Sequence, residues 1–108
     1  MVHSKNKGGR GEREFARWLK DNLGVDARRG QQYSGNSEAP DVVHSIPGVH
    51  FEVKRVERLN VTDAVVQAIA DCGEEGVPVV AHRRNHKPWL LTLRAEDLRE
   101  LSGIICDL

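Results

Sequence analysis

The chain has 108 residues, of which 39% are hydrophobic and 30% are charged, and its sixteen basic and sixteen acidic side chains give a formal net charge of zero. This composition excludes a disordered chain and argues against a strongly basic, non-specific nucleic-acid binder. No apolar run is long enough for a membrane span, and the two cysteines lack metal-ligand spacing, so we expect one reduced, cytoplasmic domain over residues 1–108.

The charges are unevenly distributed along the chain. Residues 1–35 carry eight basic and four acidic side chains, residues 83–87 form a second basic cluster, and the stretch from 96 to 107 is acidic. This asymmetry favours a protein with one phosphate-facing side, although a solvated surface explains the charges alone equally well.

The predicted elements begin with a helix. We expect residues 1–9 to form a flexible basic tail, and apolar residues at helical spacing predict a helix from Arg10 to Leu23, closed by Gly24. A strand candidate, Val25 to Arg29, and a loop of turn-forming residues, 30–37, follow.

The rest of the chain alternates between strands and helices. Asp41 to His44 and Val49 to Val56 flank a turn and together predict a hairpin. Asn60 is expected to cap a helix whose apolar stripe ends before Gly73. The remaining expected elements are a strand from Val77 to Arg83, a strand from Trp89 to Leu93 and a helix from Ala95 to Leu101. The element order is α-β-β-β-α-β-β-α, and the strand–helix–strand unit from Val49 to Arg83 is expected to form a right-handed parallel crossover. This order predicts an α/β fold with a central mixed sheet flanked by helices.

Three polar side chains of the expected hairpin have the chemistry of a metal-dependent hydrolase. Glu52 and Lys54 are two residues apart on one strand and therefore share a face, and a hairpin would place Asp41 beside Glu52. Paired carboxylates suit Mg²⁺, a bound cation would activate water and stabilise a phosphodiester's charge, and Lys54 could orient the water or neutralise that charge. As a lone pattern, acid–x–Lys is more often a solvated strand face or an ion pair than a site.

The first helix contains a further carboxylate. Glu12 lies on the apolar stripe, where a carboxylate is costly unless it is paired or bound to a cation, whereas Glu14 is expected to face solvent. The pattern therefore selects Glu12, with a favourable interaction with the helix dipole as the alternative explanation.

Taken together, three segments resemble the archaeal Holliday-junction resolvases and their phage-borne relatives, which belong to the PD-(D/E)XK nuclease superfamily. The resemblance spans roughly residues 5 to 83, and its segments are Lys7-Gly8-Gly9-Arg10-Gly11-Glu12-Arg13-Glu14-Phe15, Pro40-Asp41 and Glu52-Val53-Lys54-Arg55. It implies a restriction-endonuclease-like core, endonuclease activity on branched DNA in recombination or repair, and a bacterial, archaeal or phage-infected host cell.

The resemblance also implies roles for single residues. The catalytic set would be Glu12, Asp41, Glu52 and Lys54. The metal, Mg²⁺ with Mn²⁺ as a substitute, would be held by Asp41, Glu52 and the backbone carbonyl of Val53, with Glu12 as a further candidate. Gln67 on the second helix is an accessory candidate, and a surface glutamine explains it equally well.

The expected partner is DNA, in the form of four-way junctions, and we expect a homodimer because two matched incisions need two related sites. The residues expected to contact DNA are Lys7, Arg10, Arg13, Arg28, Arg29, Ser34, Arg55 and Arg58. Two alternatives stay open: a related nuclease that cuts flap or duplex DNA in repair or restriction, and a non-catalytic DNA-binding module. The presence of all four catalytic candidates argues against the second alternative.

Overall fold

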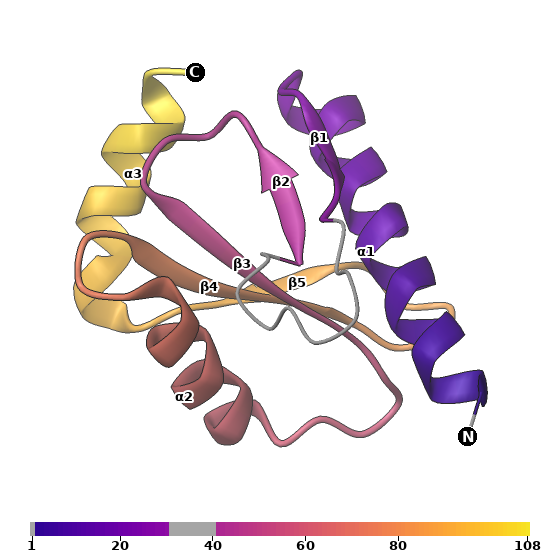
Figure 1. Cartoon of the computed structure of the whole chain (residues 1–108). Helices are drawn as coiled ribbons and strands as arrows, with labels where there is room; N and C mark the ends of the chain where they lie inside the picture. The colour runs from indigo at the N-terminus through magenta and orange to yellow at the C-terminus, as the bar shows by residue number, and fades with distance from the viewer. Residues whose placement is uncertain (1, 31–40) are drawn as a thin grey trace.

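The computed structural model describes residues 2–30 and 41–108, and side chains from residue 9 onward within these ranges. Its elements follow the predicted order, with one short 3₁₀ helix added before the last helix (Figure 1). They are α1 (Val2–Leu23), β1 (Ala27–Arg29), β2 (Val42–His44), β3 (Val49–Arg55), α2 (Val61–Cys72), β4 (Val77–Arg83), β5 (Leu90–Thr92), η1 (Ala95–Asp97) and α3 (Leu98–Cys106).

A three-stranded mixed sheet in the order β3-β4-β5 forms the centre of the fold. β3 and β4 are parallel, with Val49 opposite Val77 and Arg55 opposite Arg83, and α2 connects them. β5 is antiparallel to β4. The mixed sheet flanked by helices and the parallel strand–helix–strand connection are therefore confirmed.

The predicted hairpin between β2 and β3 is wrong. The backbone of β2 pairs instead with β1 in a separate antiparallel pair, in which Ala27 lies opposite His44 and Arg29 opposite Val42. The entry to β3 is held toward β4, because the Val77 amide donates to the Gly48 carbonyl at 2.8 Å. A turn between two short strands is a local signal, and it does not decide which strand each one pairs with.

Several element boundaries also differ from the expected ones. α1 begins at Val2 rather than Arg10, so the expected N-terminal tail continues the helix. Glycine weakens a helix but does not end it, and Gly9 and Gly11 are buried within α1, where a side chain would collide with Arg29 and Arg55. α3 continues to Cys106, and the Asn60 cap is confirmed by its side-chain oxygen, which accepts from the Asp63 amide at 3.1 Å.

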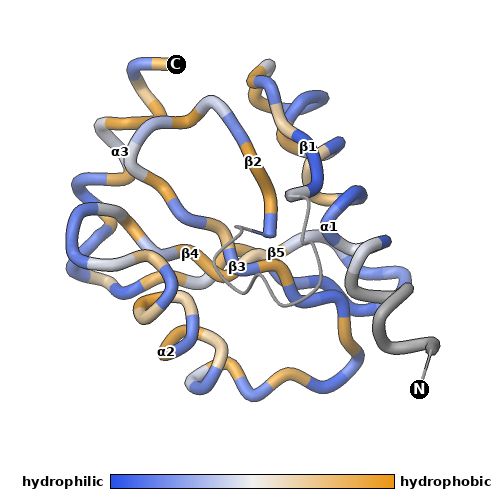
Figure 2. Tube along the Cα trace, viewed as in Figure 1, coloured by the Kyte–Doolittle hydropathy of each residue, from blue (hydrophilic) through white to orange (hydrophobic). Residues whose placement is uncertain are grey.

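The sheet is buried on both faces, and the two faces differ in size. The larger core contains alternate residues of β3 and β4, such as Phe51 and Val79, packed against Phe15 and Leu19 of α1. The smaller core joins Val80 to small residues of α2. Strand alternation therefore turns the intervening β3 positions toward α2. Figure 2 shows the apolar strands at the centre and alternating polar and apolar positions along α2.

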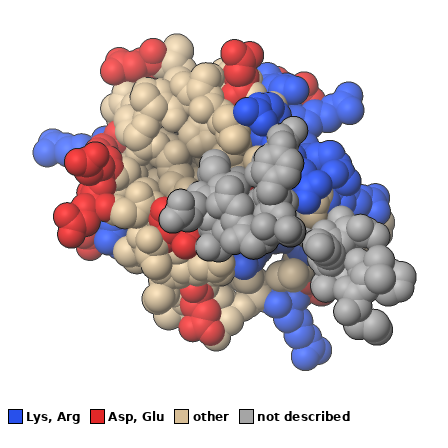
Figure 3. All heavy atoms as spheres, viewed as in Figure 1, with Lys and Arg blue, Asp and Glu red and all other residues tan. Residues whose placement is uncertain are grey.

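The charged side chains separate on the surface that Figure 3 shows, with Lys and Arg gathered over α1 and β1 and most Asp and Glu on the opposite side. The charge asymmetry along the sequence is thus also an asymmetry in space. Among the helices of the described part of the chain, none has the length and apolarity needed to cross a membrane.

Candidate active site

Glu52 is the most buried carboxylate of the candidate site. It lies in the middle of β3, its residue is 3% exposed, and it points to the α2 side of the sheet. Lys54 Nζ lies 3.7 Å from one carboxylate oxygen, Oε2, and His50 Nε2 lies 3.6 Å from the other, Oε1. Because the three residues alternate along one strand, β3 alone places an imidazole, a carboxylate and an ammonium group on one face.

Asp41 reaches β3 through its side chain rather than through strand pairing. Its Oδ2 accepts a hydrogen bond from the Val53 amide at 2.9 Å, so the carboxylate lies at the edge of β3 that faces away from β4. The expected proximity of Asp41 to Glu52 is therefore present, although the hairpin that predicted it is absent. The same bond holds Asp41 beside Val53, whose backbone carbonyl is the third expected ligand.

Glu12 approaches the same place from α1. Its side chain is 12% exposed, and its Oε2 accepts from Arg29 Nε of β1 at 3.1 Å. Burial raises its pKa, against the lowering effect of Arg29, and the charge of Glu52 raises it further. Three carboxylates from different elements thus come together: Glu12 from α1, Asp41 from the residue before β2, and Glu52 from the middle of β3.

The three carboxylates differ in how easily they ionise. Burial raises the pKa of Asp41 to about 6, assisted by the charges of Glu52 and Glu12 and opposed by the Val53 hydrogen bond. Burial also acts to raise the pKa of Glu52, but His50 and the positive charge of Lys54 outweigh it and the net shift is downward. Near neutral pH this site concentrates negative charge that its own cations balance only in part, which is the condition that a divalent cation relieves.

Two buried atoms of the site, one on Glu52 and one on His50, support a bound cation. Glu52 Oε1 is buried and has no hydrogen-bond partner within the described residues, and neither has His50 Nε2. Buried polar atoms are almost always satisfied, and a cation bound between these two atoms would satisfy both. The residues therefore fit a cation.

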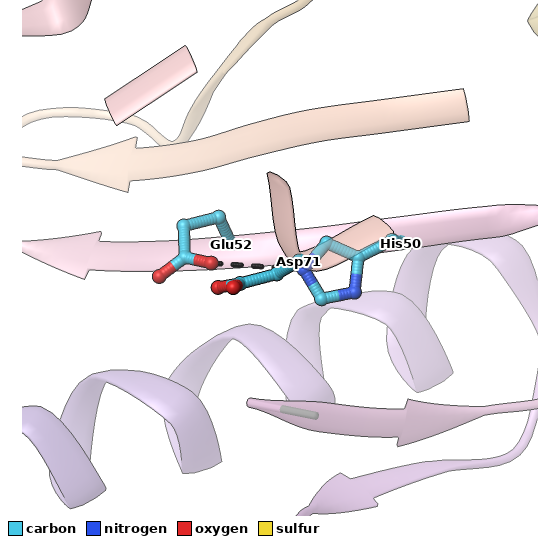
Figure 4. A group of neighbouring side chains, drawn as sticks. All are labelled: His50, Glu52 and Asp71. Atoms are coloured by element: carbon cyan, nitrogen blue, oxygen red, sulfur yellow. Dashed lines mark ion pairs between the residues drawn. The ribbon is translucent and has the colours of Figure 1, made fainter. Parts of the chain in front are cut away.

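Two residues of this cluster, His50 and Asp71, were not among the predicted site residues. Asp71 projects from α2, and Figure 4 shows its carboxylate directed into the space between Glu52 and the His50 ring. His50 could have been found from the alternation that placed Lys54 beside Glu52. Gln67, the predicted accessory residue, lies one helical turn before Asp71, is exposed and is not part of this cluster.

The prediction that Glu14 faces solvent is wrong. Its side chain is 24% exposed, and its carboxylate accepts from Arg83 at 2.9 Å and from Arg55 at 3.2 Å, with Arg10 at 3.6 Å. Helical position alone placed Glu14 away from the core stripe, but the last pair of residues of β3 and β4, Arg55 and Arg83, lies against that side of α1.

The relation to known proteins agrees with this geometry. Residues 3–105 match the family described as archaeal Holliday junction resolvase (Hjc). The chain belongs to this family. It is thus a structure-selective nuclease of the kind that resolves Holliday junctions in DNA recombination and repair.

A similar solved structure is that of Hjc from Archaeoglobus fulgidus, a Holliday junction resolvase from an archaeal hyperthermophile. The two share 25% identity, with 74% of this chain and 73% of that chain covered and a TM-score of 0.45. None of the curated proteins compared with the chain matches it.

A junction resolvase needs a phosphate-facing surface, and α1 and β1 form a basic groove of about 440 Å³. Three residues that were expected to contact DNA, Arg13, Arg28 and Arg29, line this groove, and Arg17 and Lys20 join them. Arg10 is exposed on the same helix. Since Arg29 also binds Glu12, the groove leads to the carboxylates.

A second basic groove, of about 540 Å³, lies beside the turn between β4 and β5. Arg58 lines it together with Arg83, Arg84 and Lys87. Arg55, which was also expected to contact DNA, is 12% exposed and donates to Glu14 and to Asn85, so its guanidinium is engaged within the protein. Ser34 lies outside the described residues, and Lys7 lies in α1 with its side chain outside them.

Proposed function

We propose that this resolvase hydrolyses phosphodiester bonds of four-way DNA junctions with the help of a divalent cation. The cation, Mg²⁺ with Mn²⁺ as a substitute, would be held by Asp41, Glu52 and the carbonyl of Val53. The observation that carries the proposal is the hydrogen bond from the Val53 amide to Asp41, which fixes a second carboxylate beside the strand that holds the buried, partly unsatisfied Glu52. A bound cation would supply activated water and stabilise charge on the phosphate.

The protein's own groups have separate roles in this proposal. Lys54, whose ammonium lies 3.7 Å from Glu52, would offer positive charge to the phosphate as its oxygens gain charge. Glu12, whose pKa is raised by burial, would act at the same centre as a proton acceptor. Hydrolysis joins the water oxygen to phosphorus and breaks the bond to one sugar oxygen, which leaves with a proton.

The proposed DNA-binding surface consists of the α1–β1 groove and the groove at Arg58. Arg10, Arg13, Arg28 and Arg29 would contact phosphates in the first, and Arg58 in the second. These contacts would position the backbone without reading sequence, as selectivity for DNA shape requires. Arg55 is left out of this surface because it already pairs within the protein.

We also propose that the chain acts as a homodimer. A four-way junction has near two-fold symmetry, and a C2 dimer supplies two equivalent sites for the two incisions. Large apolar side chains are exposed on α2, β5 and α3, and they offer a surface for such a contact. They are Val61, Val66, Leu90, Leu91, Leu98 and Ile105.

The proposal is tested by incubating the protein with a four-way junction and with duplex, flap and single-stranded DNA of the same sequence, with Mg²⁺ or with EDTA. Wild type should make paired, symmetric nicks in the junction only when Mg²⁺ is present. Glu52→Gln should lower the cleavage rate by a factor on the order of 10³, because it removes a ligand charge, while junction binding in a gel-shift assay stays within a fewfold of wild type.

Glu75→Gln is the matched control, because Glu75 is exposed and lies outside the site. This variant should cleave the junction at the wild-type rate. Cleavage that proceeds in EDTA, or that survives Glu52→Gln, would contradict the proposal. Cutting of flap or duplex DNA at a comparable rate would retain the metal site but replace the junction by another substrate. Binding of the junction without any cleavage would favour a non-catalytic DNA-binding module.

A further inference from the structure

The carboxylate of Glu52 has two oxygens in different surroundings. Oε2 lies 3.7 Å from Lys54 Nζ, whereas Oε1 faces His50 Nε2 at 3.6 Å, a separation longer than a hydrogen bond. Both facing atoms are buried and lack hydrogen-bond partners among the described residues, and the Glu52 side chain is 4% exposed. The two atoms form an ion pair in which neither atom makes a hydrogen bond, and a cation bound between them would satisfy both.

Asp71 adds a third candidate ligand beside His50 and Glu52. The ligand atoms of His50, Glu52 and Asp71 all lie within 4.8 Å of one another (Figure 4). Ligands bonded tetrahedrally to one ion at about 2.0–2.1 Å are separated by roughly 3.4 Å, close to the observed distance between His50 and Glu52. Asp71 is exposed on the last turns of α2, so its side chain can rotate the remaining distance.

We propose that His50, Glu52 and Asp71 form a second cation site, which shares Glu52 with the site at Asp41 and is selective for a transition-metal ion such as Mn²⁺, Co²⁺ or Zn²⁺. An imidazole nitrogen is a good ligand for these ions and a poor one for Mg²⁺, which prefers oxygen and keeps its waters. Three protein ligands leave a position open for water, as at catalytic rather than closed structural sites. The inference goes beyond the proposed function and shares only Glu52 with it.

The test isolates the second site by working in an Asp41→Asn background, where the first site has lost a charged ligand. Co²⁺ is titrated into this full-length variant and followed by calorimetry and by visible absorption. We expect one equivalent to bind, to give a visible band without a thiolate charge-transfer band, and to resist displacement by excess Mg²⁺. Adding His50→Gln or Asp71→Asn should weaken binding by about 100-fold or more, because even partners of metal ligands change affinity 10- to 100-fold.

His86→Asn is the matched control, since His86 is an exposed histidine in the β4–β5 turn at a φ of 62°, which asparagine tolerates. It should leave Co²⁺ binding unchanged. Absence of Co²⁺ binding in the Asp41→Asn background, or binding that is indifferent to His50→Gln while circular dichroism shows a folded protein, would overturn the proposal. A wild type that fails to cleave DNA but still binds Co²⁺ through His50 would contradict the proposed function and leave this second site standing.

Discussion

Two glutamates on one helix, Glu12 and Glu14, have opposite surroundings. The carboxylate of Glu14 pairs with three arginines, and through two of them it joins α1 to the ends of β3 and β4. Glu12 has one arginine and lies near further carboxylates, and burial raises its pKa. A carboxylate with a surplus of cations stabilises a fold, whereas a group of carboxylates with too few cations is prepared to bind one. The two glutamates are only two residues apart in the sequence, and their different roles follow from the side chains that surround each carboxylate.

The largest effect is expected from removing the charge of Glu14. Glu14→Gln leaves Arg55, which is 12% exposed, and Arg83 without their counter-charge, so we expect the free energy of unfolding to fall by about 2–3 kcal/mol. The measurement is urea unfolding followed by circular dichroism. The rate of junction cleavage per folded molecule should change little at low temperature, because Glu14 does not face the carboxylate group.

Asp21→Asn is the control for this prediction. Asp21 pairs with Arg17 at 3.7 Å on the same helix, but both side chains are more than half exposed, so the loss should stay below about 0.5 kcal/mol. Equal stability losses for the two variants would show that the arginines around Glu14 contribute no more than a surface pair.

A smaller effect is expected at the glycine that lets Arg55 approach α1. A Cβ on Gly11 would lie 2.5 Å from the Cβ of Arg55, so Gly11→Ala must displace β3 from the helix. We expect a net loss of about 1–2 kcal/mol of unfolding free energy, after the gain of about 1 kcal/mol that alanine brings to a helix. Gly103→Ala in α3, where the added Cβ meets open space, should instead be neutral or stabilising. Both variants are compared with wild type by urea unfolding. If Gly11→Ala were stabilised as Gly103→Ala is, the close packing of α1 on β3 would be contradicted.

The smallest expected effect concerns the carboxylates of Glu12, Asp41 and Glu52, and it depends on pH. The folded-state pKa of Asp41 is raised from 3.8 to about 6, so the folded protein binds a proton that the unfolded chain releases, and this stabilising contribution is lost as the pH rises from about 4 to about 6. Asp41→Asn imitates the neutral acid and can still accept the Val53 hydrogen bond. In EDTA above pH 6 we therefore expect this variant to be more stable than wild type by about 1 kcal/mol, less than the full shift because Asp41 and Glu52 titrate together.

Thermal unfolding of both proteins at pH 4 and at pH 7.5 measures this difference. It should vanish at pH 4 and reverse when Mg²⁺ is added at pH 7.5, since a cation bound to the native state stabilises wild type alone. A variant less stable than wild type in EDTA at pH 7.5 would mean that the Asp41 charge is already satisfied inside the protein.

The local patterns of the sequence were sufficient for the element order and for the carboxylate candidates. Helical spacing and the Asn60 cap predicted the helices, and strand alternation placed Lys54 beside Glu52, because both signals depend only on neighbouring residues. The resemblance to junction resolvases was carried by short segments around Glu12, Asp41 and Glu52, and membership of the family is now shown.

The tertiary structure alone decided how these segments meet. β2 pairs with β1 rather than β3, and Asp41 reaches Val53 through a side-chain hydrogen bond that no strand pattern encodes. The contacts of Glu14 with Arg55 and Arg83, and the approach of Asp71 to His50, join residues that lie far apart in the chain. Periodicity describes which way a side chain points from its own element, whereas its partner depends on which other elements pack there, and that is settled by burial of the whole core.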